Sequence, residues 1–202
     1  THNAFGALNN QNFTNKENSI GCIYIIRDPR NIITSLKNHY ELDDDSALKW
    51  MKRENNFIYD VEKLDRDGYS DFQFISSWET NYKSWKVQNK IPIKIIKYED
   101  LLNQTYAVFM DVVKFINNTT NNKEKISKDK LKNSVNSTLF DKLKNNEEKY
   151  GFSEAIQSKK ENKKIPFFHL GPKNDWRKIL DEDLKKKLNN VFEKNLIELL
   201  YN

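Results

Sequence analysis

Cysteine is nearly absent from this sequence, with Cys22 the only one among 202 residues. A single thiol forms neither a disulfide framework nor a cysteine metal site, so we expect no metal and a reducing, cytoplasmic setting. Long apolar runs are missing as well, and none reaches the roughly 18 residues that a membrane-spanning helix requires. The sequence therefore predicts no membrane-spanning segment and no membrane partner.

Glycine and arginine are also rare, with five residues of each. The glycines form no Gly-x-x-x-x-Gly-Lys-Ser/Thr phosphate loop. Positive charge comes mainly from lysines scattered among acidic residues, which leaves a formal net charge of only +5. This pattern favours a solvated surface over a contiguous basic face, so we expect no nucleic-acid partner. The length predicts one α/β domain over residues 1–202.

Two of the five arginines flank one turn that follows an apolar segment. The nearly continuous apolar run Ile20–Ile26 predicts a parallel strand buried on both faces. A helix should begin next, because Asp28 is a good N-cap and Pro29 suits the first helical position. Arg27 would then lie at the carboxyl edge of a strand, where open α/β sheets bind ligands, with Ser35 two turns into the helix. These residues alone leave two readings open: a phosphate site, or an ion pair of Arg27 with Asp28 or a surface carboxylate.

The rest of the chain predicts an alternation of helices and strands. A second buried strand is expected over residues 91–98, before a helix that begins at Glu99. Trp78, Tyr82 and Trp85 recur at helical spacing, which indicates a stripe that faces the core. The other expected elements are a helix over 43–64, a helix over 99–116, a polar linker over 117–129, a short helical patch over 139–143, a charged loop over 145–164 and an amphipathic helix over 181–200.

The segment from Tyr24 to Ser35 resembles the 3′-phosphate-binding motif of sulfotransferases, enzymes that use 3′-phosphoadenosine 5′-phosphosulfate (PAPS). The resemblance implies that Arg27 and Ser35 hold the 3′-phosphate of the nucleotide. It also implies an α/β, P-loop-NTPase-like fold built on a three-layer parallel sheet.

A second segment, residues 166–177, resembles the carboxyl-terminal motif of the same family. In that motif an Arg-Lys-Gly turn presents N–H groups and positive charge to the 3′-phosphate. Gly171 and Trp176 keep the family spacing, whereas His169 and Leu170 stand where Arg and Lys are usual. The resemblance therefore implies a phosphate site that relies on backbone N–H groups near Gly171, with Lys173 or Arg177 as possible sources of charge.

Four further positions resemble the adenosine-binding residues of the family. The resemblance places Tyr98 near the adenosine, with Thr138 and Phe140 against one side of the adenine and Phe167 on the other. Stacking of an aromatic side chain on a nucleobase is typically worth about 1–3 kcal/mol. Each of these aromatic residues taken singly fits a core position better than a nucleotide site, and the order of the matches carries the resemblance.

His2 follows Thr1 about two dozen residues before Arg27, which is where cytosolic-type sulfotransferases have a Thr-His pair. The resemblance implies that His2 is the general base that removes the proton of the acceptor. An unperturbed histidine pKa of about 6.5 suits that task near neutral pH. The alternative is an ordinary surface histidine at a frayed chain end.

The phosphosulfate loop of the family is absent from these residues, so the chain resembles the carboxyl-terminal two-thirds of a sulfotransferase domain with its amino-terminal part missing. The implied activity moves a sulfuryl group from PAPS to a hydroxyl or amine of a small-molecule acceptor and releases adenosine 3′,5′-bisphosphate. Without the loop we expect recognition of the 3′-phosphate but poor turnover. The alternative is a non-catalytic module that binds 3′-phosphonucleotides and does not need His2.

Overall fold

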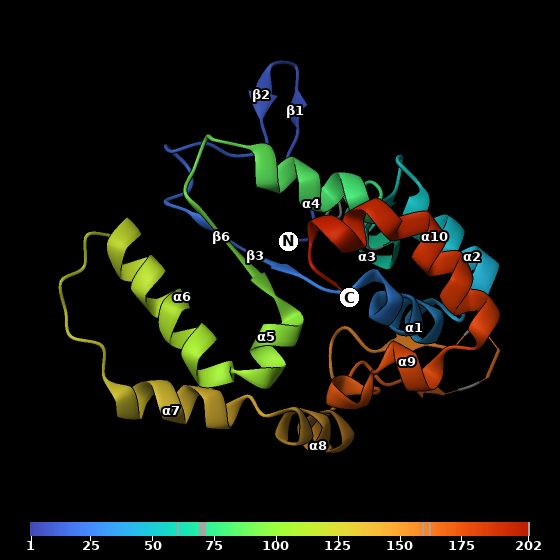
Figure 1. Cartoon of the computed structure of the whole chain (residues 1–202). Coiled ribbons are helices and arrows are strands. Elements are labelled where there is room, and N and C mark those ends of the chain that lie inside the picture. Colours follow the sequence, from blue (N-terminus) through green and yellow to red (C-terminus); the bar gives the residue numbers. More distant parts are fainter. Residues whose placement is uncertain (60, 69–71, 159, 162, 202) are drawn as a thin grey trace. The chain divides into compact units, whose positions relative to one another are not determined.

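The computed structural model describes the chain except residues 60, 69–71, 159, 162 and 202, and it contains both helices and strands (Figure 1). The contacts within the chain divide it into two compact units. The first unit comprises Thr1–Tyr24 and Leu48–Ile95, and the second comprises Ile25–Ala47 and Ile96–Asn202. That residues 1–202 form one domain stays a prediction.

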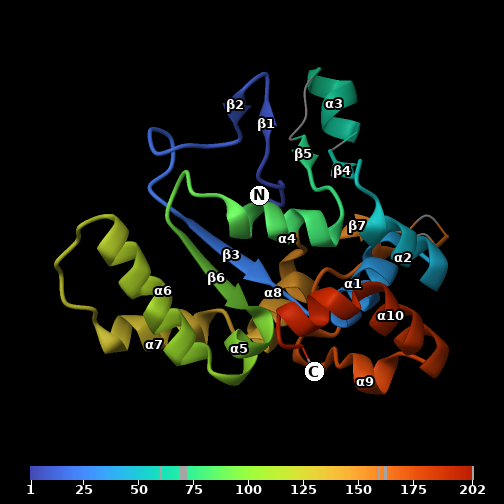
Figure 2. The same ribbon diagram turned by 45° about the horizontal axis from the view of Figure 1, so that its top comes forward.

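The central strands are β3 (Cys22–Ile26) and β6 (Ile93–Lys97), which are hydrogen-bonded neighbours in a two-stranded sheet. Both run in the same direction (Figure 2), so the predicted α/β class with a parallel sheet is confirmed. The prediction that β3 is buried on both faces is wrong. Ile26 is 3 % exposed, whereas Ile23 and Ile25 are 39 % and 54 % exposed. Successive side chains of a strand point to opposite faces, so one face of β3 is covered and the other is open.

Two antiparallel strand pairs and a buried helix build the first unit. The pairs are β1 (Ala7–Leu8) with β2 (Gln11–Asn12), and β4 (Phe57–Ile58) with β5 (Gln73–Phe74). The helices are α2 (Asp44–Lys52, which begins in the second unit), α3 (Val61–Asp67) and α4 (Trp78–Val87). The predicted stripe on α4 is confirmed in part, because Tyr82 and Trp85 are buried while Trp78 is half-buried.

The predicted helix over residues 43–64 is interrupted at Lys52. Asn56 turns the chain there, since its side-chain amide donates to the carbonyl of Trp50 at 3.2 Å. The carbonyl of Asn56 accepts from the amides of Ile75 and Ser76 at 2.8 and 3.0 Å. These long-range bonds fix an extended segment where local propensity favours a helix.

The second unit is mainly helical. Its elements are α1 (Pro29–Tyr40), α5 (Tyr98–Asn103), α6 (Thr105–Thr119), α7 (Lys128–Ser137), α8 (Phe140–Tyr150), β7 (Ile156–Gln157), β8 (Lys164–Ile165), the 3₁₀ turn η1 (Gly171–Lys173), α9 (Trp176–Ile179) and α10 (Glu182–Glu198). The amphipathic face of α10 is buried through Leu184, Leu188 and Phe192, and this helix packs against α1. The prediction of a charged loop over 145–164 is wrong, because α8 continues to Tyr150 and β7 pairs with β8. An exposed helix can be charged on most of its surface, so the missing apolar stripe misled the prediction.

A buried ion pair defines the start of α1. Asp28 is the N-cap, and its carboxylate accepts from the backbone amide of Arg30 at 2.9 Å. The Arg30 guanidinium binds the same carboxylate through Nη2 at 2.7 Å, and both residues are 4 % exposed. Arg30 also donates to the side chain of Asn189 and to the carbonyl of Tyr201, each at 3.0 Å. This pair therefore links the start of α1 to α10 and to the end of the chain.

We expect Asp28→Ala to lower the free energy of unfolding by about 3–5 kcal/mol, because it leaves a buried guanidinium without its counter-charge and removes a helix cap. Urea denaturation followed by circular dichroism measures the change. The matched control is Lys114→Ala, which breaks a 3.1 Å pair with Asp111 whose side chains are both more than half exposed. The control should cost less than about 1 kcal/mol. Equal losses in the two variants would contradict a structural role for the buried pair.

Candidate functional site

Arg27 and Tyr98 come directly after the two parallel strands, and the structure brings them into contact. The guanidinium carbon of Arg27 lies 4.3 Å from the centre of the Tyr98 ring. The Nε atom of Arg27 is buried and has no hydrogen-bond partner among the described residues. Burial lowers the pKa of Arg27, and Tyr98 with the carboxylates of Glu99 and Asp28 opposes that shift. A buried donor without a partner suits an anion at this strand edge.

Ser35 lies on α1 and is bound to the turn that follows η1. The side-chain amide of Asn174 donates to the Ser35 hydroxyl at 3.4 Å and to the carbonyl of Asn31 at 2.9 Å. The backbone amide of Asn174 donates to the carbonyl of Gly171 at 3.1 Å, and the amide of Trp176 donates to the side chain of Asn31 at 2.8 Å. The two sequence motifs, 27–35 and 166–177, are therefore in direct contact.

Gly171 and Phe140 also meet, although 31 positions separate them. Gly171 has a φ of +54°, and a Cβ built at this residue would overlap the Phe140 ring. Two residues before that ring, the hydroxyl of Thr138 donates to the carbonyls of Ser134 and Val135 at 3.1 and 3.2 Å. The Thr138 side chain therefore caps α7 in this structure.

Phe167 begins the segment that leads into Gly171. Its ring packs at 4.9 Å from Phe152 and 5.2 Å from Phe168, measured between ring centres, and is 42 % exposed. His169 is exposed, and its backbone amide donates to the carbonyl of Phe167 at 3.0 Å. Leu170 is half-buried, and its carbonyl accepts from the amide of Lys173 at 3.0 Å. An open hollow of about 550 Å³ is lined by His169 but by neither Arg27 nor Ser35. The predicted phosphate site therefore rests on the contacts of Arg27 and Ser35 and not on this hollow.

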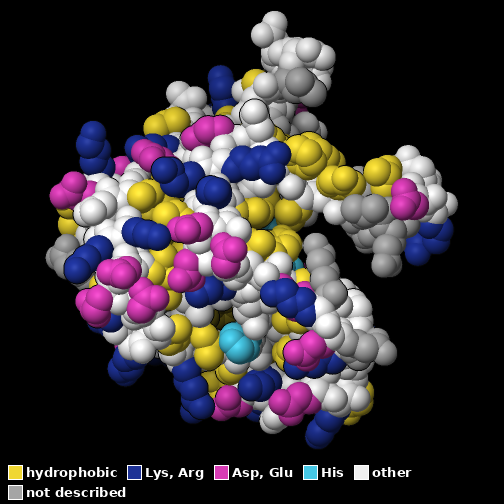
Figure 3. All heavy atoms as spheres, turned by 90° about the vertical axis from the view of Figure 1, so that its right-hand side faces the viewer, with side chains coloured by type: hydrophobic (Ala, Val, Ile, Leu, Met, Phe, Trp, Pro, Cys, Tyr) yellow, Lys and Arg dark blue, Asp and Glu magenta, His cyan; other side chains and the backbone are white. Residues whose placement is uncertain are grey.

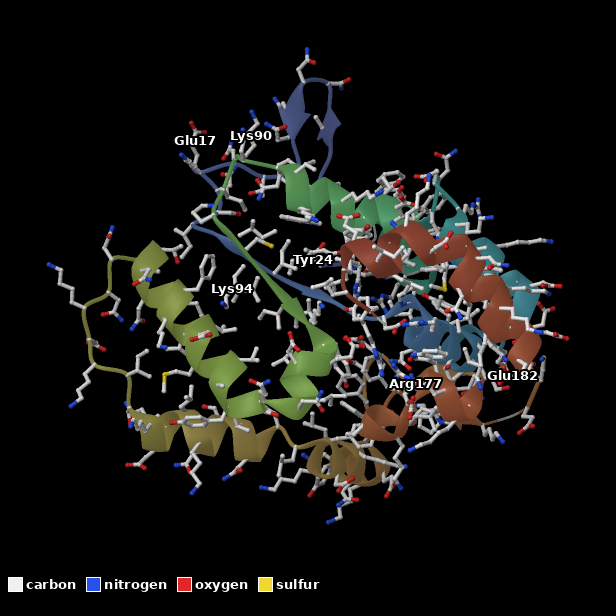
Figure 4. All side chains as sticks on the ribbon, in the orientation of Figure 1. Glu17, Tyr24, Lys90, Lys94, Arg177 and Glu182 are labelled. Carbon is white, nitrogen blue, oxygen red and sulfur yellow. The ribbon has the colours of Figure 1, made fainter. Side chains whose placement is uncertain are left out.

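Lys173 and Arg177, which the sequence suggested as sources of positive charge for the phosphate, differ in their surroundings. Arg177 lies at the start of α9 (labelled in Figure 4). Its guanidinium carbon is 4.7 Å from the centre of the Trp176 ring, and its Nη1 is 3.8 Å from Oδ1 of Asp175. Its charge is partly neutralised there. Lys173 is exposed at the end of η1, so its ammonium group is open to solvent. On the face drawn in Figure 3, Lys and Arg side chains are interspersed with Asp and Glu, as the scattered charges of the sequence predict.

His2 belongs to the first unit and is exposed. Its backbone amide donates to the side chain of Gln73 at 2.6 Å, and its carbonyl accepts from the side-chain amide of Asn81 at 2.9 Å. Asn81 is buried and also accepts from the Tyr24 hydroxyl at 2.7 Å. The next residue is held too, since the Trp85 indole donates to the carbonyl of Asn3 at 2.8 Å. The backbone around His2 is therefore fixed rather than frayed, while the role of its imidazole stays a prediction.

The predicted site residues are thus divided between the units. His2 lies in the first, and the other nine lie in the second, namely Arg27, Ser35, Tyr98, Thr138, Phe140, Phe167, His169, Leu170 and Gly171. Sequence reasoning missed Asn31, Asn174 and Asn81, which connect these residues or hold their backbone. Asparagine is so common in this chain that its presence at these three positions did not point to a role.

Two features are absent from the described residues. They contain no group of three or more His, Cys, Asp or Glu side chains that could hold a metal ion. Among the same residues, every helix is too short or too polar to cross a membrane.

The family model of the sulfotransferase domain matches residues 1–199. A curated relative, luciferin sulfotransferase of Photinus pyralis, is 22 % identical over 180 residues, which make up 86 % of this chain and 44 % of that protein. The fold is similar to that of retinol dehydratase in complex with androsterone and the inactive cofactor PAP, with a TM-score of 0.53, 19 % identity, and coverage of 86 % of this chain and 46 % of that one.

A second solved structure, mouse sulfotransferase SULT7A1 complexed with PAP, has a TM-score of 0.51 and 16 % identity, with 90 % of this chain and 59 % of that chain covered. The chain spans about half the length of the relatives it matches. These likenesses confirm the fold predicted from the sequence.

We expect Gly171→Ala to lower the free energy of unfolding by about 1–3 kcal/mol, because the new methyl group meets the Phe140 ring and the positive φ disfavours an L-residue. Urea denaturation of Gly171→Ala, Phe140→Leu and the double variant forms a thermodynamic cycle. The double variant should lose less than the sum of the two single variants, since the smaller side chain makes room for the methyl group. Additive losses would show that the ring does not press on Gly171.

Proposed function

Because this chain belongs to the sulfotransferase domain family, we propose that it binds PAPS and acts in the transfer of its sulfuryl group to a hydroxyl or amine. The single observation that supports the proposal best is the junction of the two motifs. Asn174 joins Ser35 to the turn at Gly171, and Arg27 presents a buried Nε without a partner among the described residues. These groups belong to one unit of the structure.

The 3′-phosphate would be held by Arg27, by the Ser35 hydroxyl and by backbone amides near Gly171, with His169 and Leu170 closing over it. Guanidinium fits a phosphate through two parallel N–H groups, and the stack on Tyr98 fixes its plane. A residue with positive φ next to residues in the right-handed region forms a nest of N–H groups that suits an anion. The exposed face of the Phe167 ring and the edge of Phe140 would contact the adenine, with Thr138 and Tyr98 beside the adenosine.

Two neighbouring structures support this assignment of the nucleotide. Retinol dehydratase and mouse SULT7A1 were both solved with PAP, which corresponds to adenosine 3′,5′-bisphosphate. Other ligands of retinol dehydratase are androsterone and retinol, which are small molecules with hydroxyl groups. A small-molecule hydroxyl acceptor is therefore the substrate class that we propose for this chain.

When bound, PAPS supplies the sulfuryl group. In the proposed reaction the acceptor oxygen or nitrogen attacks sulfur, the S–O bond to the 5′-phosphate breaks, and adenosine 3′,5′-bisphosphate leaves. His2 would take the proton of the acceptor on its exposed imidazole. Gln73 and Asn81 hold the backbone on either side of it. Arg27 and Ser35 would orient the nucleotide without taking part in proton transfer.

The rival proposal is a non-catalytic module that binds 3′-phosphonucleotides. It is favoured by His169 and Leu170, which stand where basic residues are usual in the family. Both proposals require Arg27 and Ser35, and only the enzyme requires His2. The two variants below separate them.

The nucleotide proposal predicts that the protein binds adenosine 3′,5′-bisphosphate at least about tenfold more tightly than AMP, because charge-assisted bonds to the additional phosphate are each worth roughly 1.5–3 kcal/mol. Isothermal titration calorimetry with both ligands measures the preference. Arg27→Lys should reduce it, since the charge is kept while the two-pronged geometry is lost. Equal affinity of the unaltered protein for the two ligands would refute the site.

The enzyme proposal predicts that His2→Ala lowers turnover by about 10²–10⁴-fold and leaves the affinity for adenosine 3′,5′-bisphosphate nearly unchanged. A base acts on the acceptor proton in the transition state, so its loss appears in kcat. A radiolabelled sulfuryl-transfer assay on the whole protein, paired with calorimetry, separates the two quantities. Transfer at the unaltered rate in His2→Ala would exclude His2 as the base and favour a base elsewhere.

A further inference from the structure

Glu147 binds the backbone of the segment that leads into Gly171. Its Oε1 accepts from the amide of Phe167 at 2.7 Å, and its Oε2 accepts from the amide of Phe168 at 2.9 Å. The side chain is half-buried. Both oxygens of one carboxylate are therefore committed to two successive N–H groups of the proposed nucleotide loop, residues 167–171.

These two bonds fix the direction of the loop where it has few other constraints. β8 ends at Ile165, and Pro166 has no N–H group to donate. Hydrogen bonds from N–H groups to an ionised carboxylate are shorter and about twice as strong as bonds between neutral groups. A bridge across two adjacent amides also orients the peptide plane between them, so it sets the path of the following residues.

Glu147 shares α8 with Phe140, seven residues earlier (α8 in Figure 1). Residues seven apart lie almost on the same face of an α-helix, two turns from each other. That face meets the loop at both of its ends: Glu147 binds the amides of Phe167 and Phe168, and the Phe140 ring fills the space beside Gly171. Helix α8 therefore contacts the loop 167–171 at both ends and supports it.

We propose that Glu147 is a positioning residue, which holds the loop 167–171 in the conformation that receives the 3′-phosphonucleotide. This inference rests on the proposed function. Because His169 and Leu170 bring no guanidinium or ammonium group to the loop, its affinity for an anion depends on where its backbone N–H groups point. Glu147 acts through the loop and touches no nucleotide in this assignment.

The chain provides a matched control in Glu148, the next residue on the same helix. Glu148 is exposed, and its replacement changes the charge and the helix propensity of α8 in the same way. Calorimetric titration with adenosine 3′,5′-bisphosphate should show a dissociation constant raised about tenfold or more in Glu147→Ala and changed less than about twofold in Glu148→Ala. AMP should lose less affinity than the bisphosphate does, because it lacks the 3′-phosphate.

Two further measurements keep the test decisive. Amide hydrogen exchange at Phe167 and Phe168 should quicken in Glu147→Ala and not in Glu148→Ala, and urea denaturation shows whether Glu147→Ala stays folded. If Glu147→Ala unfolds, Glu147→Gln takes its place in the titration, because it keeps the size of the side chain and one acceptor oxygen. The dissociation constant of this variant for adenosine 3′,5′-bisphosphate should then be higher than those of the unaltered protein and of Glu148→Ala, but raised less than about tenfold.

The outcomes separate this inference from the proposed function. If the unaltered protein prefers the bisphosphate to AMP and the Glu147 variants bind it as Glu148→Ala does, the positioning role is overturned while the nucleotide site stands. If the unaltered protein shows no such preference, the proposed function itself fails, and the positioning role fails with it.

Discussion

The second unit is organised around the guanidinium of Arg30, which is buried against the Asp28 carboxylate at the start of α1. The same group donates to Asn189 on α10 and to the carbonyl of Tyr201, and it lies 4.0 Å above the ring of Trp176. All the polar atoms of this cation are thereby directed into the protein. A buried charge is tolerated only with such partners, so α1, α10 and the start of α9 must take these positions together.

This arrangement gives the two arginines of the turn different tasks. Arg30 is committed to the fold, whereas Arg27 stacks on Tyr98 and keeps a buried Nε without a partner among the described residues. The carboxylate that the sequence offered as an ion-pair partner of Arg27 is instead bound to Arg30. Because Asp28 binds Arg30 and not Arg27, Arg27 stays available for an anion.

Local signals made the start of this site predictable from the sequence. An apolar strand followed by Asp28 and Pro29 specifies a helix start whatever the rest of the chain does, and Arg27 and Ser35 follow from that start. Asn174 and Glu147 were not predictable, because their hydrogen bonds join residues 143 and 20 positions apart. Asparagine and glutamate are also common in this chain, so neither residue stands out in the sequence. The prediction of a strand buried on both faces failed because burial depends on distant segments. The prediction of a loop over 145–164 failed because an exposed helix such as α8 needs no apolar stripe.

The same long-range bonds would let the proposed phosphate site bind an anion with so little charge. A turn with Arg and Lys attracts an anion even when its backbone is loosely held, because the Coulomb term varies slowly with distance. A turn with His169 and Leu170 must rely on N–H groups, and a hydrogen bond weakens steeply once its angle departs from linearity. Asn174, Phe140 and Glu147 hold this turn in place. In the proposed site, this rigidity compensates for the positive charge that the turn lacks.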